Sequence, residues 1–180
     1  MRLLRIADSP RIHSLTRYIA IIDAISERVG GFASWLTLLM VAVGTTNALA
    51  RYAGKLIGLN LSSNASIELQ WQLFSMVFLL GAAATLRRDQ HVRVDVLYGR
   101  LSKRNQAWLD LVGGVFFLVP FCIFGLVMCW PAVRNSWAVL EVSPDPGGLV
   151  RYPIKAMMLA CFGLLLLQGS AEIARRVHFL

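Results

Sequence analysis

The sequence predicts an all-α integral membrane protein with four transmembrane helices, preceded by an amphipathic helix at the membrane surface. The 180-residue chain is 57% hydrophobic, and its apolar residues form long runs instead of short periodic pieces. Its 18 Lys and Arg residues collect between those runs, which is typical of membrane proteins. Because these basic residues form no face with interleaved aromatic side chains, the net charge of +8 does not indicate nucleic-acid binding.

The first 29 residues predict a cytoplasmic N-terminus that contains the amphipathic helix. Apolar residues recur at three- or four-residue spacing between positions 12 and 25, and charged residues take other positions. Pro10 suits a first helical position, and Gly30 with Gly31 suits a stop or a hinge. A signal peptide is the alternative, but Asp23 interrupts its apolar part and no clean small-residue cleavage site follows.

Residues 30–180 predict a membrane domain of four helices, with spans near residues 30–50, 66–86, 109–133 and 154–174. A span needs about 20 apolar residues, and helices are expected because each one satisfies its own backbone hydrogen bonds in lipid. The first three runs meet this length directly. The fourth meets it if its flanking side chains extend to the membrane surface. Pro120 removes one backbone hydrogen bond from the third span, which should therefore bend.

The distribution of basic residues predicts that both termini lie in the cytoplasm. With four spans, 13 of the Lys and Arg residues fall on the side of the termini and the middle loop, and five fall on the other side. The middle loop contains the stretch HVRVDV at residues 91–96, in which valines alternate with Arg93 and Asp95. This loop anchors the topology at an anionic leaflet. The alternation leaves three readings open: valines that rest on the membrane, valines that rest on another protein, and a solvated basic turn.

The spans offer little for chemistry. Their interiors contain no Asp, Glu, Lys, Arg or His, which are the groups that mark ion paths and catalytic sites in membranes. The three cysteines form no CxxC motif and no cluster with His, so we expect neither a metal nor a cofactor, and no enzymatic activity. The alternative function is the membrane anchor of a redox complex, but haem requires axial ligands, and all three His residues lie outside the spans.

Two stretches of the sequence resemble one known family. The second span with its exit reads ELQWQLFSMVFLLGAAATLRRDQHVRVDVLYGRLS, and the fourth-span region reads EVSPDPGGLVRYPIKAMMLACFGLLLLQGSAEI. The Trp in the first turn, the GAAA run, the HVRVD stretch, the Pro-Gly loop and the PIK and LLLLQG segments are similar to the small membrane subunit of tripartite ATP-independent periplasmic (TRAP) transporters, the DctQ family. The resemblance covers residues 68–176.

The resemblance implies a non-catalytic small permease subunit in the bacterial inner membrane. The transporter would be a secondary one, driven by a cation gradient, usually sodium, and would import an organic acid. The implied partners are a large permease subunit, which this chain braces, and a periplasmic substrate-binding protein, together with membrane lipids. From motif and resemblance together, the residues expected at a partner interface or in a structural motif are Trp71, Gly81, Arg87, Arg88, His91, Arg93, Asp95, Pro144, Gly147, Gly148, Lys155 and Gln168.

Overall fold

The computed structural model describes residues 10–59, 61–90 and 98–180, with side chains from residue 14 onward. These residues form helices and no strand, apart from one isolated antiparallel bridge between Val142 and Val150. The elements are α1 (Pro10–Ile57), α2 (Asn64–Arg87), α4 (Lys103–Gly113), the π-helix η2 (Gly114–Leu118), α5 (Val119–Ala138) and α6 (Tyr152–Phe179). Four helical stretches are long and apolar enough to cross a membrane, which confirms the predicted all-α class with four spans.

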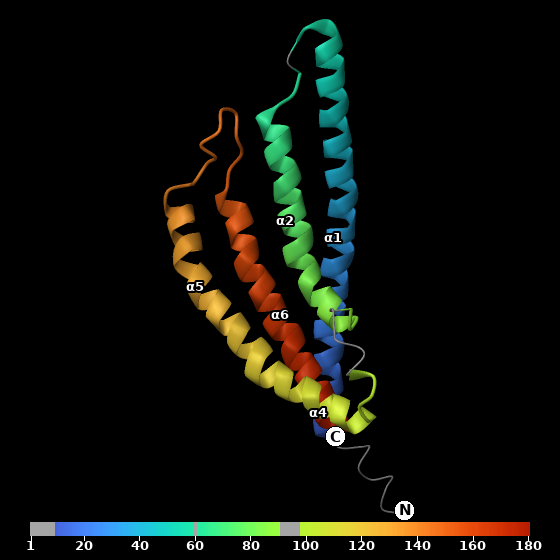
Figure 1. Ribbon diagram of the computed structural model, residues 1–180. Coiled ribbons are helices and arrows are strands. Elements are labelled where there is room, and N and C mark those ends of the chain that lie inside the picture. The colour runs from blue at the N-terminus through green and yellow to red at the C-terminus, as the bar shows by residue number, and fades with distance from the viewer. Residues whose placement is uncertain (1–9, 60, 91–97) are drawn as a thin grey trace, which may run out of the picture.

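The helices run between two ends of an elongated bundle (Figure 1). At the terminal end, α1 begins, α6 ends and α2 leads towards α4. At the far end lie the connection from α1 to α2, residues 58–63, and the loop from α5 to α6, residues 139–151. Among the described residues, most of the Lys and Arg side chains therefore belong to the terminal end.

The predicted amphipathic helix is not a separate element. Helix α1 is a single helix of 48 residues that continues through Gly30 and Gly31 into the first span, so the helix does not stop there. A hinge, the other expectation for these glycines, stays a prediction. A Cβ atom added to Gly30 would come within 2.5 Å of the Ala84 Cβ atom, which shows that this glycine lets α1 and α2 approach closely. The boundary expected between residues 29 and 30 therefore falls inside α1.

The length of α1 has a consequence for its position in a bilayer. At 1.5 Å per residue the helix is about 70 Å long, more than twice the roughly 30 Å of a hydrocarbon core. Its N-terminal part still packs in the bundle, because Ile22 and Ser26 are buried. One face of this part of α1 is therefore covered, and Ile21, Ile25 and Phe32 are exposed beside that face.

Helix α6 is the central helix of the bundle. It contacts α1, α2, α4 and α5, and it lies between α5 and the pair formed by α1 and α2 (Figure 1). Small residues suit this position: Cys161, Gly169 and Ala171 are buried. A Cβ atom on Gly169 would lie 2.8 Å from Leu118, so the third span passes close to α6 at this point.

The third span is one continuous helical stretch, Lys103–Ala138, that curves along α6 (Figure 1). Pro120 has no N–H group, and the turn before it widens into η2, where the N–H group of Val119 donates to the Gly114 carbonyl. The bend predicted from Pro120 thus appears together with a π-helical turn. Insertion of such a turn is one of the recognised causes of helix bending.

Candidate functional site

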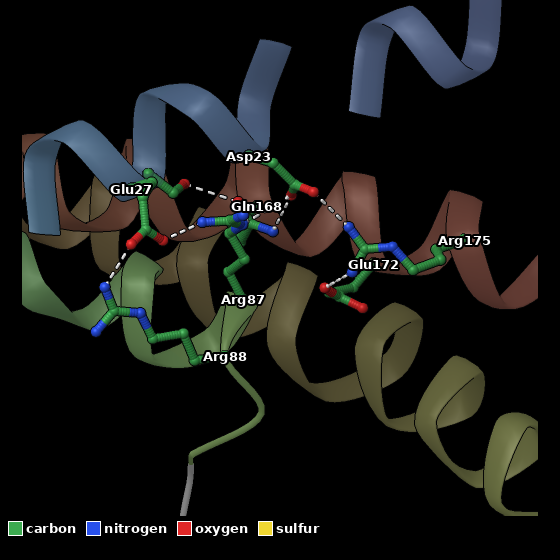
Figure 2. Close-up of polar contacts among 8 residues, drawn as sticks. Asp23, Glu27, Arg87, Arg88, Gln168, Glu172 and Arg175 are labelled. Atoms are coloured by element: carbon green, nitrogen blue, oxygen red, sulfur yellow. Dashed lines mark hydrogen bonds and ion pairs between the residues drawn. The ribbon is translucent and has the colours of Figure 1, made fainter. Parts of the chain in front are cut away.

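A cluster of charged and amide side chains joins three helices near the terminal end (Figure 2). Helix α1 contributes two carboxylates, the end of α2 contributes two guanidinium groups, and α6 contributes an amide, a carboxylate and a guanidinium group. We name this set the terminal cluster; it consists of Asp23, Ser26, Glu27, Arg87, Arg88, Gln168, Glu172 and Arg175.

Gln168 lies at the centre of the terminal cluster and is fully buried, with 0% of the residue exposed. Its Oε1 atom accepts a hydrogen bond from Ser26 Oγ at 2.7 Å, and its Nε2 atom donates to Asp23 Oδ1 at 3.0 Å. A buried amide destabilises a protein unless its polar atoms find partners. Gln168 meets this requirement through α1, so it fixes the position of α6 against that helix.

The carboxylates of α1 bind cations from both neighbouring helices. Asp23 Oδ2 accepts from Arg175 Nη2 of α6 at 2.7 Å, and Asp23 Oδ1 lies 3.8 Å from Arg87 Nε of α2. Glu27 pairs with Arg87 and with Arg88, the latter at 2.5 Å. The Asp23 and Arg87 side chains are partly shielded from water, at 20% and 31% exposed, whereas the Glu27–Arg88 pair is exposed and contributes little. The terminal cluster therefore cross-links α1, α2 and α6.

A neighbouring contact connects the third span to the same end of the bundle. Asp110 of α4 lies 3.1 Å from Arg176 of α6, and its Oδ2 atom accepts a hydrogen bond from the Tyr98 hydroxyl at 2.7 Å. Helix α6 thus carries polar links to α1 and α4 within a few turns, and the carboxylates of α1 connect it in turn to α2. This supports its position at the centre of the bundle.

A second polar cluster lies at the far end, around one buried carboxylate. Only 5% of the Glu68 side chain is exposed, although it belongs to the first turns of α2. Its oxygens accept hydrogen bonds from the Ser143 hydroxyl and from the Leu149 N–H group at 2.6 Å, and Arg151 lies 3.6 Å away. We name this set the far cluster; it consists of Glu68, Gln72, Glu141, Ser143, Leu149, Arg151 and Lys155.

The loop of residues 139–151 closes over Glu68 because its sequence allows a compact turn. Gly147 has φ = +72°, a backbone conformation that glycine adopts without strain. A Cβ atom on Gly148 would lie 2.4 Å from the Ser143 Cβ atom, so glycine is also needed there. Pro144 is an exposed member of the same loop. The loop binds α2 further through Gln72, whose Nε2 atom donates to the Val150 carbonyl at 3.0 Å.

Two cations complete the far cluster. Arg151 lies with its guanidinium carbon 5.9 Å from the ring centroid of Trp71, a distance suited to a cation–π contact. Lys155 pairs with Glu141 of the loop. The hydrogen bond from Lys155 holds the pKa of Glu141 below its ordinary value.

The expected site residues fall into several groups. Arg87, Arg88 and Gln168 belong to the terminal cluster, whereas Trp71, Gly147, Gly148 and Lys155 belong to the far cluster or its loop, with Pro144 beside them. Gly81 lines a shallow depression between α1 and α2, and a Cβ atom on it would meet no atom within 4 Å. His91, Arg93 and Asp95 lie outside the described residues. Their part in a partner interface stays a prediction.

The acidic half of both clusters is absent from the expected site residues. Asp23 and Glu27 belong to the charged positions of the expected amphipathic helix, and Glu68 lies at the beginning of the expected second span. A signal was present in the spacing, because Asp23 and Glu27, like Glu68 and Gln72, are four residues apart and share one helical face. In the part of the chain that the structure describes, no group of three or more His, Cys, Asp or Glu side chains could hold a metal ion.

Comparison with known proteins agrees with this architecture. Residues 40–179 match the family model described as tripartite ATP-independent periplasmic transporters, DctQ component. No curated protein and no solved structure matches the chain. The family match covers three of the four spans completely and most of both polar clusters. The chain therefore belongs to the DctQ family and is the small permease component of a TRAP transporter.

Proposed function

We propose that this chain is the fixed, non-catalytic scaffold that braces the large permease subunit in the bacterial inner membrane. The transporter would import an organic acid, delivered by a periplasmic binding protein, at the expense of a cation gradient, which we expect to be sodium. The family match is the observation that carries this proposal. The large subunit moves the substrate, and this chain holds the stationary part of that subunit in place.

The two polar clusters support a bracing role in physical terms. A scaffold that resists a moving neighbour must keep its own helices in register, and apolar helices in lipid gain little from hydrophobic association. Hydrogen bonds and ion pairs between helices can instead fix the helices in one relative position, because they depend on direction. Here they lie at both ends of the bundle: the terminal cluster joins α1, α2 and α6, and the far cluster joins α2 to the loop before α6.

Reconstitution of the transporter tests the proposal. Proteoliposomes would contain the large permease subunit alone, this chain alone, or both, with the binding protein and a labelled organic acid outside. We expect uptake only when both membrane subunits are present, and we expect it to stop when the sodium gradient is removed. Uptake by liposomes that contain this chain alone would contradict a non-transporting scaffold. Full uptake by the large subunit alone would contradict the requirement for bracing.

The orientation of the chain is a second part of the proposal. The excess of basic residues at the terminal end favours a cytoplasmic position for that end. Single cysteines at Lys103 and at Asp145, in a background without the native cysteines, would be treated with an impermeant maleimide in intact spheroplasts. We expect labelling at position 145 only. Labelling at position 103 and none at 145 would reverse the proposed topology.

A further inference from the structure

An apolar groove lies between α2 and α6 in the half of the bundle nearer the far end. Its volume is about 520 Å³. The walls carry large side chains, and two of the aromatic residues are mostly exposed, Phe74 at 58% and Phe78 at 70%. The apolar lining residues are Trp71, Phe74, Phe78, Leu79, Ile154 and Met158. The groove therefore opens on the surface of a span, where a bilayer would supply hydrocarbon.

One end of the groove is polar. Arg151, Lys155 and Glu141 line it there, at the first turn of α6 and beside the loop. Trp71 lies at the same end, in the early part of α2, which is the position at which Trp residues mark the membrane–water interface. The groove thus has a charged rim at the interface, with two cations and one carboxylate, and an apolar interior that runs about two helical turns deeper.

The rim has more hydrogen-bond donors than the described residues use. Arg151 donates through Nη2 to Ser143 at 3.0 Å and lies near Glu68, while 30% of its side chain stays exposed. Glu68 already accepts from Ser143 and Leu149, and Glu141 already pairs with Lys155. A further anionic acceptor at this rim would complement the free donor capacity of the guanidinium and ammonium groups.

We propose that the groove binds one phospholipid, with its phosphate at Arg151 and Lys155 and an acyl chain along Phe74, Phe78 and Met158. A phosphate supplies the acceptors that the rim lacks, and Arg and Lys are the side chains that bind phosphate best. A helix of another protein fits less well, because close helix packing in membranes uses small residues, and this groove is walled by bulky ones. A flexible acyl chain adapts to such an irregular wall.

The test measures lipid retention by native mass spectrometry of the full-length chain after extraction in mild detergent. Ser75→Trp fills the groove from α2: Ser75 lines it, and its hydroxyl donates only within its own helix, to the Trp71 carbonyl at 2.9 Å. Val127→Trp on α5 adds the same bulk at a position that is 58% exposed and lies outside the groove. We expect wild type and Val127→Trp to retain one phospholipid, and Ser75→Trp to bind it about tenfold more weakly.

A second experiment distinguishes recognition of the phosphate from filling of the groove by hydrocarbon alone. Delipidated protein would be titrated with a short-chain phospholipid and with a diacylglycerol that has the same chains but no phosphate. We expect the diacylglycerol to bind about tenfold more weakly. Equal binding of the two, equal retention by wild type and Ser75→Trp, or no retention by wild type would overturn the proposal. A photo-crosslinker at position 75 that captures the large permease subunit instead of lipid would assign the groove to a protein interface and would also overturn it.

Discussion

The two polar clusters hold the same bundle together by different means. The terminal cluster consists of side chains from three helices, and two of its carboxylates, Asp23 and Glu27, each contact two cations. The far cluster depends on one carboxylate, Glu68, which a loop covers with a hydroxyl group, a backbone N–H group and a guanidinium group. The terminal cluster is redundant, whereas the far cluster has a single centre. Loss of one residue should therefore matter more at the far end.

The largest effect is expected from Glu68→Leu. The substitution leaves the Leu149 N–H group, the Ser143 hydroxyl and the charge of Arg151 without their shared acceptor, and removal of one partner from a buried charged contact is strongly destabilising. We expect the thermal unfolding midpoint in detergent, followed by Trp fluorescence, to fall by roughly 10 °C.

The matched control for this prediction is Asp145→Leu in the same loop. This substitution also removes a carboxylate, but the Asp145 side chain is exposed, and the residue bonds to Ser143 and Gly148 through its backbone. We expect a change of at most about 2 °C for the control. Equal midpoints for the two variants would mean that Glu68 does not organise the far end.

Gln168→Leu should produce the next largest effect. The leucine cannot accept from Ser26 Oγ or donate to Asp23, so the buried hydroxyl of Ser26 loses its partner. We expect a loss of about 1–3 kcal/mol in the free energy of unfolding, because an unsatisfied buried donor costs its desolvation. Chemical unfolding of the purified chain measures this. The exposed Gln90 provides the control, since Gln90→Leu makes the same change where the side chain faces solvent.

Redundancy within the terminal cluster predicts a graded response. Asp23 contacts cations of both α2 and α6, whereas Glu27 contacts only those of α2. Asp23→Asn should therefore lower the unfolding midpoint by about 4 °C, and Glu27→Gln by about 2 °C. If the order is reversed, the link between α1 and α6 carries less of the stability than its geometry indicates.

These differences also explain what could be predicted from the sequence. The four spans follow from uninterrupted apolar runs, and the turn at Gly147 and Gly148 follows from the SPDPGG segment, since both depend on local chemistry. The way in which α1 packs against the other helices does not follow from local chemistry. Its buried face runs through Ile22, Ser26 and Gly30, four residues apart, and two of these three are not hydrophobic.

The partners of that buried face explain why the pattern was not recognised. Gly30 is needed because Ala84 of α2 lies against it, and Ser26 is buried because Gln168 of α6 accepts its hydrogen bond. Neither neighbour is visible from the sequence around α1. The periodic isoleucines indicated a helix correctly, but they could not indicate which side of it meets the bundle: Ile22 is buried and Ile25 is 40% exposed.

The smallest effect concerns the rim of the far cluster and depends on pH. Lys155 lowers the pKa of Glu141 below its ordinary value of 4.5, so the pair contributes its full stabilisation above that pH and loses it as the pH falls through the lowered pKa. Lys155→Met removes the largest cause of the lowered pKa. The fall in unfolding midpoint between about pH 7 and pH 4 should then be smaller than in wild type by about 1–2 °C.

The control is Lys103→Met at the terminal end, where the lysine is exposed and makes no ion pair with the described residues. This variant should keep the acid sensitivity of wild type, because no carboxylate pKa depends on it. If both lysine variants respond to acid as wild type does, Lys155 does not hold Glu141, and the far end depends on Glu68 alone.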